Sequence, residues 1–120
     1  MNRFYLSIIF LAVRFLSATP AQVIILPTAE TDVSGNLTTQ GFERAGALPE
    51  YISSTSNLTE FGLPFAIFGA RPSNSAGDGT QACLQTVGPT AQSLSLPIHS
   101  GYSKLQTEEV SSFILNNPDY

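Results

Sequence analysis

The stretch that decides the expected fold is residues 23–48, VIILPTAETDVSGNLTTQGFERAGAL, which combines an apolar run, a polar loop and a capped helix. Residues 23–26 are all apolar, three of the four are β-branched, and Pro27 closes the run. Such a run is typical of a parallel strand covered on both faces. Thr38 is a favourable N-cap residue, and Ala45 lies on the apolar face of the helix that follows. We therefore expect a strand over 23–26 and a helix over 38–48.

The helix opens with the pattern Leu-Thr-x-x-Gly-x-x-Arg-Ala at positions 37–45. Together with the strand before it, this pattern resembles the histidine phosphatase superfamily, the phosphoglycerate-mutase-like phosphohydrolases. In that family the first strand ends in Arg-His-Gly/Ala-Glu, and its His is the nucleophile. The matching tetrad here, at 27–30, is Pro-Thr-Ala-Glu. The Arg and the His of the family therefore have no counterpart in this chain.

The resemblance continues toward the C-terminus. Residues 61–68 are similar to the family's second strand and its lead-in, and residues 81–92 are similar to the helix that follows. In that helix the family carries a phosphate-binding Arg three residues before a Gln-Thr pair. Gln85 and Thr86 match the pair, but the position of the Arg is occupied by Ala82.

These replacements bear directly on activity. In phosphoryl transfer a neutral imidazole attacks phosphorus, and guanidinium groups bind the equatorial oxygens as negative charge builds there. Thr28 cannot replace the imidazole without an activating base beside it, Pro27 has no side-chain donor, and Ala82 offers nothing to a phosphate. Because such groups act as a unit, the resemblance implies a catalytically inactive protein. The alternative is a phosphohydrolase with altered or residual activity that uses Thr28, Glu30 and Arg71.

Three residues are candidates for binding a phosphorylated small molecule or another anion: Thr28, Glu30 and Arg71. In open parallel sheets ligands bind beyond the carboxyl ends of the strands, so the loops at 27–36 and 69–79 are expected to flank one crevice. A solvated loop position is the alternative for Arg71, and a cap of the strand end is the alternative for Glu30. The resemblance implies no cofactor.

Other single residues and short patterns suggest little chemistry. Cys83 is the only cysteine, which excludes an internal disulfide and a cysteine-based zinc or iron–sulfur site. His99 matches neither histidine of the family and is expected to be half-exposed. Arg44 is expected to pair with an acidic neighbour rather than with substrate. Two triplets, Asn-Leu-Thr at 36–38 and at 57–59, fit the glycosylation acceptor pattern, which also arises by chance.

Strands and helices are expected to alternate along the chain. After the helix that Pro49 should end or kink, the patterns predict a strand at 65–68, a helix at 81–94, an extended segment at 97–102 and a helix at 107–115. The segments 23–26 and 65–68 should be adjacent parallel strands. This alternation implies an α/β fold, a parallel sheet with helices on both faces. The resemblance makes it a partial phosphoglycerate-mutase-like arrangement, βαβαβα.

Residues 1–21 have the features of a secretory signal peptide: a basic start, an apolar run at 4–13 and small residues at 17–21. Arg14 keeps the apolar run too short to span a bilayer, and a buried N-terminal helix is the alternative. We expect a secreted or periplasmic protein with no stable membrane span after removal of the signal. The remaining chain keeps three basic against nine acidic residues, a formal charge of −6. This charge disfavours nucleic acid and anionic membrane surfaces as partners.

Residues 22–120 are expected to form a partial histidine-phosphatase-like domain. After the last predicted helix, family members continue to another core strand that bears their second catalytic His. A nonfunctional fragment of a longer phosphatase is therefore a further alternative. A sheet that stops after three strands leaves an open edge, so self-association through this edge is also expected.

Overall fold

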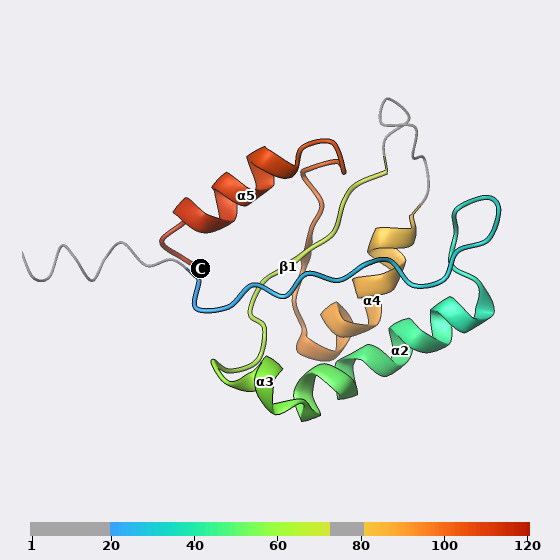
Figure 1. The fold of residues 1–120 in the computed structure, drawn as a ribbon, viewed down its shortest axis with the longest axis horizontal. Helices are drawn as coiled ribbons and strands as arrows, with labels where there is room; N and C mark the ends of the chain where they lie inside the picture. The colour runs from blue at the N-terminus through green and yellow to red at the C-terminus, as the bar shows by residue number, and fades with distance from the viewer. Residues whose placement is uncertain (1–19, 73–80) are drawn as a thin grey trace, which may run out of the picture.

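The computed structural model describes residues 20–72 and 81–120 of the 120-residue chain. In these residues four helices and two short strands follow one another along the chain (Figure 1): α2 (Thr39–Ser54), α3 (Ser56–Thr59), β1 (Ile67–Phe68), α4 (Ala82–Leu94), β2 (Ile98–His99) and α5 (Thr107–Asn116). The two strands are parallel and hydrogen-bonded to each other. The described chain is thus a mixed helical structure with a small parallel sheet. Most of the predicted signal peptide and most of the loop at 69–79 lie outside the described residues.

Helix α2 begins where the sequence predicts and ends later. Thr38 is its N-cap, and the Thr38 hydroxyl accepts a hydrogen bond from Gly41 N at 3.1 Å. The helix continues through Pro49 to Ser54, so of the two outcomes expected at Pro49, an end or a kink, the end is wrong. Ala45 and Ile52 are seven residues apart, share one face and are buried, and α2 packs on α4. This burial outweighs the loss of the hydrogen bond that a proline cannot donate.

The small sheet lies between helices α4 and α5. Gly69 extends the pairing of β1 and β2, because its N–H donates to His99 O at 3.1 Å. A side chain at Gly69 would meet the Leu84 side chain of α4, whereas Phe68 faces Phe113 of α5 with ring centroids 6.2 Å apart. Since successive side chains of a strand point to opposite faces, α4 and α5 cover opposite faces of the sheet.

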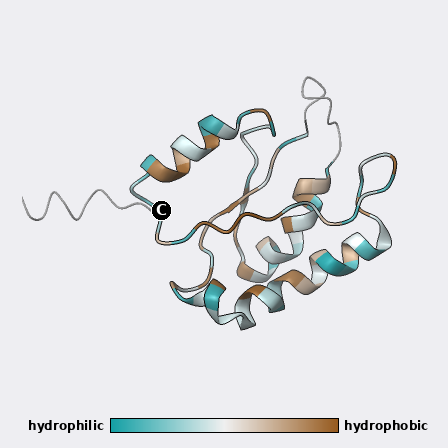
Figure 2. Cartoon of the chain, in the orientation of Figure 1, coloured by the Kyte–Doolittle hydropathy of each residue, from teal (hydrophilic) through white to brown (hydrophobic). Residues whose placement is uncertain are grey.

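The first predicted strand does not form. Residues 23–26 belong to no strand, and β1 pairs with β2 instead of with this segment. Ile25 is 88% exposed, and the apolar run crosses the structure as a brown, extended stretch in Figure 2. The Gln22 side chain, directly before the run, donates from Nε2 to Asn57 O at 2.9 Å. The hydropathy of the run matches a buried strand, but the described residues provide no layer that covers it.

The other predicted elements are found, with shorter strands. The strand expected at 65–68 is confined to Ile67–Phe68, and the extended segment at 97–102 contributes Ile98–His99. The helices expected at 81–94 and 107–115 are confirmed within one residue at each end.

An aromatic cluster attaches α5 and the C-terminal residues to the sheet. The Phe68 ring stacks on the imidazole of His99 with centroids 4.9 Å apart, and it meets the rings of Phe113 and Tyr120 edge-on. The Tyr120 hydroxyl lies 3.4 Å from His99 Nε2. His99 is exposed rather than half-exposed, and its contacts are those of a packing residue.

The core of the described chain is built from small side chains. Its central cluster consists of Ala29, Leu37, Ala45 and Ala82. This cluster joins the loop before α2 to the first turns of α2 and α4. The tetrad at 27–30 therefore contributes Ala29 to this cluster.

Candidate functional site

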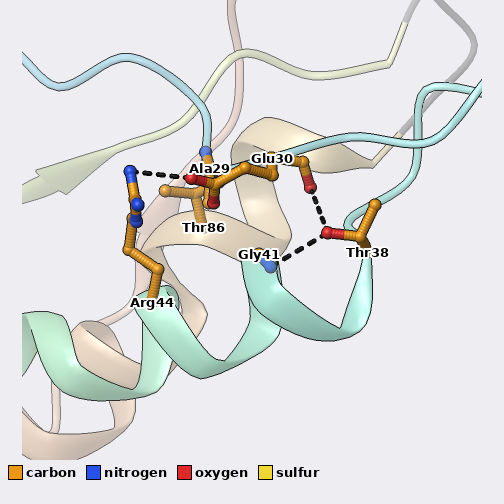
Figure 3. A network of polar contacts seen from close by, with 6 residues as sticks. All are labelled: Ala29, Glu30, Thr38, Gly41, Arg44 and Thr86. Carbon is orange, nitrogen blue, oxygen red and sulfur yellow. Dashed lines mark hydrogen bonds and ion pairs between the residues drawn. The ribbon is translucent and has the colours of Figure 1, made fainter.

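The tetrad at 27–30 meets the N-terminal end of α2 (Figure 3). Glu30 O accepts hydrogen bonds from Thr38 N at 2.9 Å and from the Thr38 hydroxyl at 3.3 Å. The same hydroxyl accepts from Gly41 N, so the helix cap and the tetrad share one polar network. The first turn of α2 is thereby fixed against the backbone of Glu30.

Glu30 and Arg44 form an ion pair in this network. Arg44 Nη1 lies 2.7 Å from Glu30 Oε1, and the two side chains are 66% and 33% exposed, respectively. The expectation that Arg44 pairs with an acidic neighbour is confirmed. Glu30 Oε2 is buried and has no hydrogen-bond partner among the described residues. The ion pair therefore joins the tetrad to α2.

Gln85 and Thr86 have a role that sequence reasoning missed. Thr86 Oγ1 accepts from Ala29 N at 3.1 Å, and Gln85 Oε1 accepts from Leu37 N at 3.1 Å. The two adjacent side chains of α4 thus bind both ends of the loop at 29–37. The Gln-Thr pair in the sequence was a visible signal, although nothing in the pattern indicated that backbone amides were its partners.

Ala82 belongs to the core. It is 4% exposed, and its carbonyl accepts a hydrogen bond from the Thr86 hydroxyl at 2.7 Å. The position at which the family carries a phosphate-binding Arg therefore lies in the alanine-rich cluster of this chain.

The remaining candidates are spread over the surface. Pro27 and Thr28 are exposed beside the network, while the exposed Arg71 follows β1. Arg71 N donates to Tyr102 O at 2.9 Å, and Arg71 forms an isolated parallel bridge with Ser103, which continues the pairing of the sheet. The structure links neither Thr28 nor Arg71 to Glu30. The expected crevice between the loops at 27–36 and 69–79 involves residues that lie largely outside the described ones.

Gly41 is a third residue whose role the sequence did not reveal. A Cβ atom at this position would overlap Glu30 O. The glycine of the helix-opening pattern is therefore required for the close approach of α2 to the tetrad. The signal for this role in the sequence was that Gly41 follows the N-cap residue Thr38 by three positions.

The loop between the tetrad and α2 is closed by its own hydrogen bonds. Asp32 Oδ1 accepts from Ser34 N at 2.8 Å and from Asn36 N at 3.2 Å, and Thr31 forms an antiparallel bridge with Leu37. Gly35 has a φ of 80°, which glycine adopts without strain. This loop is a self-contained turn.

A surface groove lies elsewhere, between α2 and α4, and includes Gly46, Leu63 and Thr90 but none of the tetrad. Within residues 20–72 and 81–120 no group of three or more His, Cys, Asp or Glu side chains is placed to hold a metal ion. The helices in those ranges are all too short or too polar to cross a membrane. Comparisons with protein families, with curated proteins and with solved structures found no match.

Proposed function

We propose that this chain is an exported protein similar to the histidine phosphatases that lacks phosphohydrolase activity and uses the motif region mainly as a structural junction. The burial of Ala82, which is 4% exposed, is the observation that carries this proposal, because the family's phosphate-binding Arg would stand at this position. In addition, the Arg44 guanidinium beside the tetrad is engaged by the Glu30 carboxylate. The motif residues Gln85 and Thr86 are likewise bound to backbone amides.

The order of strands and helices along the chain supports the fold that we propose. Strand β1, helix α4 and strand β2 form a parallel strand–helix–strand unit, which agrees with the alternation of strands and helices in the proposed fold. A partial βαβαβα arrangement is the fold that we propose. Export is supported by the basic start, the apolar run and the small residues within 1–21.

A generic phosphomonoester assay on the purified protein tests inactivity. Hydrolysis should be undetectable above a blank, and Thr28→Ala should leave that result unchanged. Robust turnover that Thr28→Ala abolishes would overturn the proposal, and would establish the alternative of residual phosphohydrolase activity with Thr28 as its nucleophile.

We also propose weak binding of a phosphorylated small molecule or another anion beside Glu30, with Thr28 and Arg71 as the candidate ligands. Titration with inorganic phosphate, followed by amide NMR shifts, measures this binding. Glu30→Gln should tighten it because the variant removes a repelling charge and releases Arg44. Glu43→Gln is the matched control, since it makes the same change in net charge at an exposed position of α2. Equal effects of the two variants would argue against a site at Glu30.

A second candidate function, an interaction module whose sheet another chain covers, is favoured by exposed apolar side chains. Ile25, Leu63 and Phe65 are all exposed, and the sheet has two strands of two residues each. Exposed apolar surface of this kind marks an interaction site or a tendency to aggregate.

A further inference from the structure

Both Asn-Leu-Thr triplets lie on the surface of the described chain. Asn36 is in the turn before α2, Asn57 is in α3, and both are exposed. The hydrogen bonds observed at these residues use backbone atoms: Asn36 bonds with Asp32, and Asn57 O accepts from Gln22 Nε2. Neither asparagine side chain is needed for the core, and substituents on both would extend into solvent.

We propose that Asn36 and Asn57 accept N-linked oligosaccharides during export, which rests on the exported location proposed above. The side-chain amide nitrogen attacks the anomeric carbon of an oligosaccharide carried on a lipid diphosphate. A carbon–nitrogen bond forms and the carbon–oxygen bond to the diphosphate breaks. The amide loses one proton to a base of the transferase, and the lipid diphosphate leaves with the bonding electrons. The products are a glycosylated amide and a free lipid diphosphate, with no oxidation or reduction.

The threonine hydroxyls indicate when attachment occurs. The acceptor pattern includes a hydroxyl two residues after the asparagine. In the folded chain Thr38 Oγ1 is bonded to Gly41 N and Glu30 O, and Thr59 Oγ1 donates to Thr55 O at 3.3 Å. Attachment therefore precedes folding, when both hydroxyls are accessible. These bonds do not involve an asparagine side chain, so they form afterwards in the glycosylated chain.

Both acceptors are close in sequence to a large exposed apolar side chain. Val33 precedes Asn36 by three residues, and Phe61 follows Asn57 by four residues. An oligosaccharide is bulky and solubilising. Glycans at these two positions would therefore shield apolar surface that the described chain leaves uncovered at Val33 and Phe61.

Expression of the full chain in a eukaryotic secretory cell tests the proposal. One version keeps the natural N-terminus, and a second carries a proven leader in front of residue 22. The secreted protein is treated with a peptide N-glycosidase and compared by gel mobility and intact mass. We expect two glycosidase-sensitive steps, and Asn36→Gln and Asn57→Gln should each remove one of them.

Three further variants separate recognition of the triplet from nonspecific effects. Thr59→Ser keeps the required hydroxyl and should retain the Asn57 glycan, whereas Thr59→Ala should lose it although Asn57 is intact. Asn116→Gln is the matched control, because Asn116 is exposed but has no Ser or Thr two residues later, and it should leave both glycans in place.

The two versions distinguish acceptor function from export. Unmodified protein secreted with the proven leader would overturn the acceptor proposal. A single glycosidase-sensitive step in the wild-type protein would overturn it for the triplet whose Asn→Gln variant leaves that step unchanged. Modification with the proven leader but not with the natural N-terminus would support the acceptors and overturn export.

Discussion

Thr86 Oγ1 accepts a hydrogen bond from Ala29 N at 3.1 Å, across 57 residues of sequence. The same hydroxyl donates to Ala82 O at 2.7 Å, so one buried side chain serves as both acceptor and donor. A strand at the N-terminus would have received its hydrogen bonds from a neighbouring strand. In this chain a side chain of α4 binds the segment that carries the tetrad, and the stability of that attachment depends on Thr86.

Thr86→Val should destabilise the protein by about 1–3 kcal/mol, because it leaves the buried Ala29 N–H without an acceptor while preserving the side-chain shape. Chemical denaturation measures the free energy of unfolding. Thr90→Val is the matched control one turn along the same helix. Thr90 Oγ1 is also buried but has no partner among the described residues, so its loss should be neutral or stabilising. Equal losses in the two variants would contradict the assigned role of Thr86.

Gly41→Ala should be strongly unfavourable, since the added methyl group overlaps Glu30 O. We expect a loss of about 1–3 kcal/mol, together with amide shift changes at Glu30 and Thr38. Gly46→Ala in the same helix is the control, because space at that position is open. It should stabilise the protein by about 0.5–1 kcal/mol through helix propensity. A stabilising Gly41→Ala would show that α2 and the tetrad are farther apart than described.

Helices α2, α4 and α5 were predictable from local sequence because their signals are local, whereas the four-residue α3 was not predicted. The cap at Thr38, the apolar spacing of α4 and the acidic first turn of α5 each lie within the element that they define. Strands depend on partners elsewhere in the chain. The run at 23–26 has a stronger hydropathy signal than 97–102, yet only the latter segment contributes a strand, because β1 pairs with it. Hydropathy indicates a preference for burial and does not supply a neighbour.

The candidate site was predictable in its residues but only partly in its contacts. The Arg44 ion pair followed from charge alone, although its partner Glu30 precedes the helix. Gln85 accepts from the N–H of Leu37, and Gly41 lies close to the carbonyl of Glu30. Both roles therefore depend on backbone groups of other segments. Backbone groups are the same at every position, so a sequence pattern does not identify which of them a distant side chain will meet.

Phe113→Ala should loosen α5 without unfolding the α2–α4 pair. Phe113 contacts the rings of Phe68, Tyr102 and Tyr120, and aromatic pairs contribute about 0.5–1.5 kcal/mol each beyond area burial. Hydrogen exchange should accelerate at α5 amides and remain unchanged in α4. Leu115→Ala, on the same helix at a similarly exposed position, is the control and should have a smaller effect. Uniform acceleration across all helices would indicate a single cooperative unit instead.

The unglycosylated chain should self-associate through the apolar run at 23–26. Ile25 is 88% exposed, its segment lacks a strand partner, and no charged residue occurs between positions 20 and 29 to oppose contact between copies. Ile25→Lys should therefore raise the monomer fraction in sedimentation velocity while changing the free energy of unfolding by less than about 0.5 kcal/mol. Val33→Lys is the matched control, since it makes a similar change at a fully exposed position in the turn before α2.

A monomeric wild-type sample with cooperative unfolding and well-dispersed amide signals would contradict the prediction. Equal solubilisation by the two variants would assign the effect to net charge rather than to the apolar run.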